Sequence, residues 1–252
     1  MHPFDERNFV ASMKDRMVIF SPSNLTEELP KFSWEDVSII QLVGIGAFGS
    51  VELANFRAAT DTNPCQKVVI KQPLENLGRT REFLKEAQLL HSVKGHRNTI
   101  EFIAVCGKLQ YGIMQEHMSF SFAMFDDDTN VSSLCEFLSR VDEMYDFVGF
   151  EKVKIRIAND IIDGLSFLHE REIVHGDLKP SNIMESNAHY SNVSKEEAIV
   201  QWQTGHVPIV TKLTDLGESR SDMIQTKSLV TSKVFRALKI AYRIDLRLKS
   251  VC

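Results

Sequence analysis

The octapeptide HGDLKPSN, residues 175–182, places an aspartate, a lysine and an asparagine at short fixed offsets, as Asp177, Lys179 and Asn182. A carboxylate can orient an attacking hydroxyl and accept its proton, an ammonium can neutralise a transferred phosphoryl group, and an amide oxygen can bind Mg²⁺. A simple turn also explains these residues, because Asp, Gly, Pro and Asn all favour turns. The stretch therefore suggests phosphoryl transfer as a hypothesis that other segments must support.

A glycine cluster upstream is suited to binding phosphates. The segment GIGAFGSV contains Gly44, Gly46 and Gly49 between two apolar runs that predict strands. Glycines let the backbone approach an anion closely, because no Cβ intervenes. A strand rather than a helix follows the third glycine, which disfavours a dinucleotide-binding fingerprint. For this segment taken alone, a plain hairpin turn stays open as the alternative.

Three further residues carry charge where a phosphate or metal site would need it. Lys71 ends the β-branched run VVIK, so we expect its ammonium to be partly buried and to need an anionic partner. Glu86 follows 15 positions later, in a segment whose apolar residues recur at helical spacing. Asp215, in the sequence TDLG, offers a further oxygen ligand beside Gly217. A solvated surface or a turn explains each residue singly.

The order of these five signals resembles that of eukaryotic protein kinase domains, namely GxGxxGxV, VxIK, a helical glutamate, HxDxKxxN and DxG. The similarity runs from about Trp34 to about Ser232, and DLKPSN resembles the serine/threonine type. It implies an α+β, bilobal fold in which ATP binds between a small antiparallel-sheet lobe and an incomplete helical large lobe. For the small lobe we expect five strands with one inserted helix.

The resemblance also divides the chain into regions. Residues 1–37 form an N-terminal lead-in, residues 38–233 form the kinase domain, and residues 234–252 form a basic tail that matches no kinase element. Within the domain we expect the small lobe at 38–116 and a partial large lobe at 117–233.

ATP and Mg²⁺ are the cofactors that the resemblance implies, and it assigns roles to the matching residues. The catalytic residues would be the base Asp177, the γ-phosphate contact Lys179, and the ion pair of Lys71 and Glu86 that holds the α- and β-phosphates. The Mg²⁺ ligands would be Asn182 and Asp215. The nucleotide-binding residues would be Val43, Gly44, Gly46, Gly49, Val51, Val69, Lys71, Glu116, Met118 and Met184.

The resemblance further implies how the two lobes connect. Gln115 would be the gatekeeper beside the nucleotide, and the backbone of 116–118 would be the hinge that grips adenine. Leu90, His175 and Leu216 would join in a packed column that links the lobes.

One residue of the opening octapeptide departs from the pattern. Gly176 stands where the resembled kinases have an arginine that pairs with a phosphate on the activation loop. Asp177 is unaffected, so we expect weakened control by phosphorylation rather than a lost base. The candidate phosphorylation sites are Thr226, Ser228, Thr231 and Ser232.

Two segments are longer than the pattern requires. The first, 120–133, contains Asp126, Asp127 and Asp128; it is interpreted either as a solvated loop or as a site that attracts basic substrate residues. The second, 185–210, is a possible docking site for a partner, and it contains a predicted short helix capped by Ser194.

The end of the sequence departs furthest from the pattern. After Asp215 only 37 residues follow, no proline occurs after Pro208, and the Ala-Pro-Glu of the pattern is absent. We therefore expect a truncated form of a protein serine/threonine kinase, with low activity toward Ser or Thr hydroxyls of a protein substrate. The alternative is a catalytically impaired nucleotide-binding pseudokinase or scaffold.

Composition and charge argue against several other classes of protein. The 252 residues are 43% hydrophobic with a net charge of −5, which argues against bulk binding of nucleic acid. No apolar run reaches the roughly 18 residues of a membrane-spanning helix. The charged N-terminus also has no signal-peptide pattern, so we expect a cytoplasmic protein without a transmembrane segment.

Overall fold

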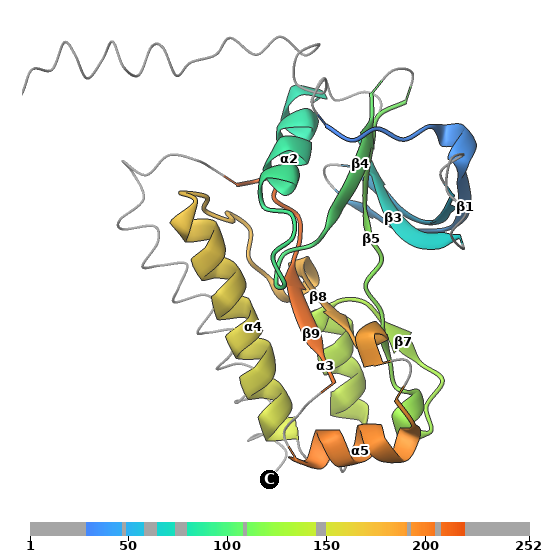
Figure 1. Ribbon diagram of the computed structural model, residues 1–252, viewed down its shortest axis with the longest axis vertical. Helices are drawn as coiled ribbons and strands as arrows, with labels where there is room; N and C mark the ends of the chain where they lie inside the picture. Colours follow the sequence, from blue (N-terminus) through green and yellow to red (C-terminus); the bar gives the residue numbers. More distant parts are fainter. Residues whose placement is uncertain are drawn as a thin grey trace, which may run out of the picture.

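The computed structural model describes residues 29–46, 49–57, 65–73, 80–107, 110–144, 150–190, 193–204 and 208–219. These residues form the expected α+β, bilobal architecture, with a sheet and one helix above a mainly helical lobe (Figure 1). The candidate phosphorylation sites at 226–232, the basic tail and the first part of the lead-in lie outside the described residues.

The small lobe is an antiparallel five-stranded sheet with the strand order β1-β2-β3-β5-β4, as predicted. One helix, α2, is inserted between β3 and β4 (Figure 1). The elements are β1 (Val37–Gly46), β2 (Gly49–Phe56), β3 (Gln66–Gln72), α2 (Thr80–Ser92), β4 (Phe102–Cys106) and β5 (Gly112–Glu116).

The two faces of this sheet build separate cores. Val68 and Ile70 alternate on β3 and point to the face that also buries Met114. The other face meets α2, whose Phe83, Leu84, Ala87 and Leu90 are buried at helical spacing. The predicted helical spacing of the segment that contains Glu86 therefore corresponds to the buried face of α2.

The ordered small lobe begins earlier than the predicted boundary at residue 38. Leu29 and Phe32 are buried, and Phe32 N–H donates to Val105 O at 3.3 Å. A 3₁₀ turn, η1 (Trp34–Asp36), follows, and the Trp34 indole donates to Gln110 O at 3.0 Å. Residues 29–36 of the predicted lead-in therefore pack on the small lobe, because Phe32 and Trp34 lie against the sheet.

The described part of the large lobe contains α3 (Leu134–Glu143), α4 (Phe150–Glu170), α5 (Lys195–Thr204) and the antiparallel pair β8 (Ile183–Ser186) and β9 (Val210–Leu213). On α4, the side chains of Ile157, Ile161, Leu165 and Leu168 form a buried stripe. Ile162 is 47% exposed and Ile155 is 62% exposed. Within the described ranges, no helix is both long and apolar enough to span a membrane.

Backbone contacts join the two lobes beside α4. Leu213 N–H donates to Asn98 O, and Ile100 N–H donates to Leu213 O, both at 2.9 Å. Gly164 of α4 lies against this junction, where a Cβ would approach Asn98 O to 2.7 Å. The segment after α2 is therefore held between α4 and the strand that leads to Asp215.

The two long segments are folded parts of the large lobe and contact each other. The first forms β6 (Phe120–Ser121), the 3₁₀ turn η2 (Ala123–Phe125) and β7 (Asn130–Val131). The second contributes the end of β8, η4 (Ala188–Tyr190) and α5, with Glu197 N–H donating to the predicted cap Ser194. Trp202 of α5 is 1% exposed, and its ring lies 5.3 Å from that of Phe125. The solvated-loop interpretation is therefore wrong for the buried residues of the first segment, whereas partner docking at the second segment stays a prediction.

The aspartates of the first segment are engaged within the lobe. Asp127 forms an ion pair with Arg140 at 2.6 Å and accepts a hydrogen bond from the Thr129 hydroxyl at 2.5 Å. Asp126 forms an ion pair with Lys195 of α5. These contacts do not support the hypothesis that Asp126 and Asp127 attract basic substrate residues.

A buried carboxyl group connects β8, β9 and α4. Glu185 is 0% exposed, and its Oε2 accepts a hydrogen bond from the Thr211 hydroxyl at 2.7 Å. Its Oε1 has no hydrogen-bond partner among the described residues. Thr211 N–H in turn donates to Asp160 of α4 at 3.1 Å. Burial, reinforced by the charge of Asp160, raises the pKa of Glu185 well above its ordinary value.

We predict that Glu185→Gln is more stable than the wild type at pH 8 and that the difference shrinks toward pH 5. Folding takes up a proton at Glu185, so the stability from this group is complete below the unfolded pKa and is lost as pH rises toward the folded pKa. The loss reaches about 1.4 kcal/mol per pH unit for one proton. Urea unfolding between pH 5 and 8 measures it, with the exposed Glu197→Gln as the control. Parallel pH profiles for wild type and Glu185→Gln would contradict the prediction.

Candidate active site

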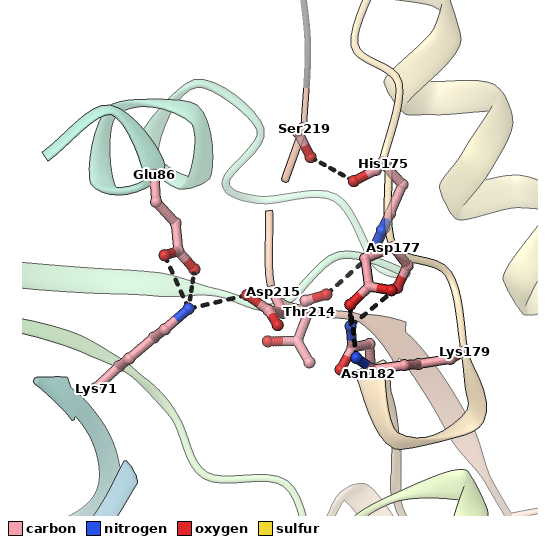
Figure 2. A network of polar contacts seen from close by, with 9 residues as sticks. All are labelled: Lys71, Glu86, His175, Asp177, Lys179, Asn182, Thr214, Asp215 and Ser219. Carbon is pink, nitrogen blue, oxygen red and sulfur yellow. Dashed lines mark hydrogen bonds and ion pairs between the residues drawn. The ribbon is translucent and has the colours of Figure 1, made fainter. Parts of the chain in front are cut away.

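Three charged side chains from three elements meet between the lobes (Figure 2). The Lys71 ammonium contacts both carboxylate oxygens of Glu86 at 2.8 Å and Asp215 Oδ1 at 2.9 Å. The Lys71 and Glu86 side chains are 12% and 3% exposed, and that of Asp215 is 27% exposed. The expected pair of Lys71 and Glu86 is present, and Asp215 joins it.

Local structure brings these residues together. Lys71 lies near the end of β3, on the sheet face opposite to buried Val68 and Ile70, so it points toward α2. Glu86 lies on the buried side of α2 and faces the sheet. Asp215 follows β9 and has a left-handed backbone with φ of 63°. Gly217 leaves room for both carboxylates, since a Cβ there would lie 3.3 Å from Glu86 Oε2.

The protonation states suit a site that binds an anion and a cation. Burial alone would lower the pKa of Lys71, but the charges and hydrogen bonds of Glu86 and Asp215 outweigh it and raise that pKa. Burial opposes ionisation of Asp215, yet attraction to Lys71 outweighs it and lowers the pKa of this carboxyl. Lys71 is therefore an ammonium and Asp215 a carboxylate at neutral pH.

The loop of the opening octapeptide lies next to this cluster (Figure 2). The Lys179 ammonium contacts Asp177 Oδ2 at 2.6 Å. Asn182, in the 3₁₀ turn η3 (Pro180–Asn182), donates from Nδ2 to Asp177 O at 2.9 Å and to Asp177 Oδ2 at 3.1 Å. Because Nδ2 is held in this way, Oδ1 is the atom that Asn182 would offer to a cation.

His175 ties this loop to the strand that precedes Asp215. Its Nε2 lies 2.9 Å from Thr214 O, and burial lowers its pKa, so the neutral ring donates this hydrogen bond. His175 and Leu216 are each 2% exposed and Leu90 is 1% exposed. All three residues of the expected column are therefore in the interior.

The structure explains why a glycine occupies position 176, which the sequence alone did not. Its φ is +88°, and a Cβ would lie 2.3 Å from the carbonyl oxygen of Glu218. The next residue, Ser219, donates from its hydroxyl to His175 O at 2.9 Å. The chain after Asp215 therefore packs directly on the loop at the position where an arginine was expected.

Nearly all of the residues that the resemblance assigns to nucleotide binding lie on strands of both lobes. On β1 and β2, a Cβ at Gly44 or Gly46 would meet no atom within 4 Å, whereas a Cβ at Gly49 would lie 1.8 Å from Gln72 O. The other residues of this set on the small lobe are Val43, Val51 and Val69, with Met184 on β8 below. Open space at two glycines, the Lys71 ammonium, and oxygen ligands at Asn182 and Asp215 fit a nucleoside triphosphate with a divalent metal.

The residues around the predicted hinge are largely buried. Gln115 and Met118 are 7% and 3% exposed. The Glu116 side chain is engaged within the protein, because its Oε1 accepts hydrogen bonds from Glu101 N–H at 2.7 Å and from Lys212 at 2.5 Å. Sequence reasoning did not find Lys212, because a lysine within a buried strand has no distinguishing pattern of its own.

Comparison with known proteins gives a family match over most of the chain. The protein kinase domain model matches residues 37–240. Serine/threonine-protein kinase STY17 of Arabidopsis thaliana is 24% identical over 169 residues, 65% of this chain and 25% of that protein. Cyclin-dependent kinase E-1 of the same plant is 28% identical over 166 residues, covering 64% and 32%. Tyrosine-protein kinase Src64B of Drosophila melanogaster is 27% identical over 158 residues, covering 62% and 24%. The chain thus spans a third or less of each of these proteins.

We predict that Gly176→Ala destabilises the protein about 1–3 kcal/mol more than Gly95→Ala. Both glycines have left-handed backbones, with φ of +88° and +83°, but a Cβ at Gly95 would meet no atom within 4 Å. The control therefore measures backbone strain alone, and the difference measures the clash with Glu218 O. Denaturant unfolding of the two variants tests this. Equal losses would contradict the close approach, as would a stable Gly176→Arg variant.

Proposed function

This chain belongs to the protein kinase family, and from that premise we propose that it is an ATP- and Mg²⁺-dependent kinase that phosphorylates Ser or Thr hydroxyls of a protein substrate. The observation that carries the proposal is the convergence of Lys71, Asp177, Asn182 and Asp215 between the two lobes. When bound, ATP with Mg²⁺ supplies the phosphoryl group and the positive charge that neutralises it. What the whole protein phosphorylates and which partners it binds are also matters of this proposal.

Lys71 is the residue suited to hold the nucleotide phosphates. Lys71 pairs with Val51 of β2, next to the strand ends that carry Gly44, Gly46 and Gly49. Glycines there allow a phosphate to approach the backbone closely, because no Cβ intervenes. Glu86 keeps the ammonium oriented, because two 2.8 Å contacts fix its position on the α2 side. Asp215 and Asn182 are suited to hold the metal, since each offers an oxygen ligand.

Asp177 is suited to accept the proton of the attacking hydroxyl. Its Oδ2 contacts Asn182 Nδ2 at 3.1 Å and Lys179 Nζ at 2.6 Å, so the carboxylate is held in place and Oδ1 is left for the hydroxyl. Lys179 is half exposed, at 51%, and is able to move from Asp177 to a transferring phosphoryl group. This positioning is the main contribution that a kinase makes to catalysis.

The preference for Ser or Thr over Tyr rests on Lys179, which lies two positions after the base in the manner of serine/threonine kinases. Relatives of both types match the chain, so the acceptor must be tested with serine, threonine and tyrosine substrates. The low activity expected of the 252-residue chain also stays a prediction, as does the cytoplasmic location.

We predict that Lys71→Met and Asp215→Asn each weaken ATP·Mg²⁺ binding about tenfold or more and reduce phosphoryl transfer about a hundredfold. Calorimetry measures binding, and γ-labelled ATP with peptide libraries that contain only Ser, Thr or Tyr measures transfer and acceptor. The matched control is Lys85→Met, which removes an exposed lysine adjacent to Glu86 on α2. Unchanged affinity in both variants would contradict the site. Binding without transfer would favour the alternative of a nucleotide-binding pseudokinase.

A further inference from the structure

The hinge segment, defined here as residues 116–121, is held at both ends by the β8–β9 pair. The first residue of the segment is Glu116, whose Oε1 is contacted by Lys212 of β9 at 2.5 Å. The last residue is Ser121, whose backbone makes two hydrogen bonds with the side chain of Asn187, the residue that directly follows β8. Four residues lie between these two points. One structural unit of the large lobe therefore fixes both ends of the hinge segment.

The contact at Glu116 is largely shielded from water. The Lys212 side chain is 11% exposed and that of Glu116 is 21% exposed. Glu116 Oε1 also accepts a hydrogen bond from Glu101 N–H, and Glu116 N–H donates to Glu101 O at 3.1 Å. Removing one member of such a shielded pair leaves the other charge poorly compensated, so the contact has a strongly preferred geometry.

The contact at Ser121 imitates the pairing of two strands. Ser121 N–H donates to Asn187 Oδ1 at 2.9 Å, and Asn187 Nδ2 donates to Ser121 O at 2.8 Å. The backbone N–H of Asn187 also donates to Ser119 O at 3.3 Å. A side-chain amide is suited to this task, because it offers one donor and one acceptor in the same plane.

We propose that Lys212 and Asn187 are positioning residues that hold the hinge segment in the geometry required for nucleotide binding. The inference rests on the proposed function, in which the backbone of 116–118 grips adenine. The same β8–β9 unit carries Met184 and leads directly to Asp215. The backbone that grips adenine and the metal ligand Asp215 are thereby fixed relative to each other before a nucleotide binds.

Preorganisation of the hinge segment predicts that releasing it lowers the affinity for nucleotide. A hinge segment held at both ends loses less conformational freedom when it binds a ligand, so the affinity is higher than for a hinge that must first be ordered. Releasing either end weakens nucleotide binding. Turnover at saturating nucleotide changes less, because Asp177, Asn182 and Asp215 keep their own contacts.

The test measures ATP·Mg²⁺ affinity by calorimetry for Lys212→Met and Asn187→Ala. Each is expected to raise Kd about three- to tenfold with less than a twofold change in kcat. Lys212→Arg, which keeps the cation, is expected to stay within twofold of wild type. In a Glu116→Gln background, Lys212→Met is expected to have little further effect, because the two residues act through one contact. The control is Lys195→Met, whose lysine pairs with Asp126 on the surface.

Hydrogen exchange of the free protein separates this inference from the proposed function. Both variants are expected to accelerate exchange of the backbone amides of 116–121 when no nucleotide is present. If the wild type binds no nucleotide, the proposed function fails while this measurement still tests the positioning. The inference would be overturned if both the exchange rates and the Kd were unchanged, or if either variant bound nucleotide more tightly. It would also be overturned if Lys195→Met raised the Kd as much as the two variants do. If Lys212→Met does not fold, Asn187→Ala alone decides the outcome.

Discussion

The structure depends on one shared ammonium. Lys71 contacts Glu86 on the helix of the small lobe and Asp215 at the edge of the large lobe, at distances of 2.8 and 2.9 Å. Three elements must be correctly placed for these contacts to form, and the Glu86 side chain is nearly fully buried. Removal of one partner from a buried ion pair typically costs about 3–5 kcal/mol, so the cluster strongly favours a single arrangement of α2 and β9.

Close backbone approaches support this arrangement from the large lobe. At Gly176 the chain after Asp215 packs against the catalytic loop, and at Gly164 helix α4 packs against Asn98 O. At both glycines the neighbouring carbonyl oxygen lies too close for a Cβ to fit. In the kinases that this sequence resembles, an arginine at the position of Gly176 reaches an activation-loop phosphate. Here backbone packing at Glu218 and the hydrogen bond from Ser219 to His175 O connect this loop to the residues that directly follow Asp215.

Sequence reasoning was most successful where a residue type and a local pattern coincide. The strand pattern predicted that Lys71 needs an anionic partner, and the resemblance to protein kinases identified Glu86 as that partner. The packing of Trp202 on Phe125 could not be predicted, because the two residues lie in separate inserts with no shared period. The same holds for Lys212, whose partner Glu116 is distant in sequence and had been interpreted only through its backbone.

The central claim is that the Lys71 cluster is a nucleotide and metal site between the lobes. A crystal structure of the chain with Mg²⁺ and a non-hydrolysable ATP analogue tests it most directly. The expected result places the phosphates beside Lys71, with its contact to Glu86 retained, and Mg²⁺ at about 2.0–2.1 Å from oxygens of Asp215 and Asn182. An analogue bound away from the cleft, or a cleft that stays empty at saturating ligand, would contradict the claim.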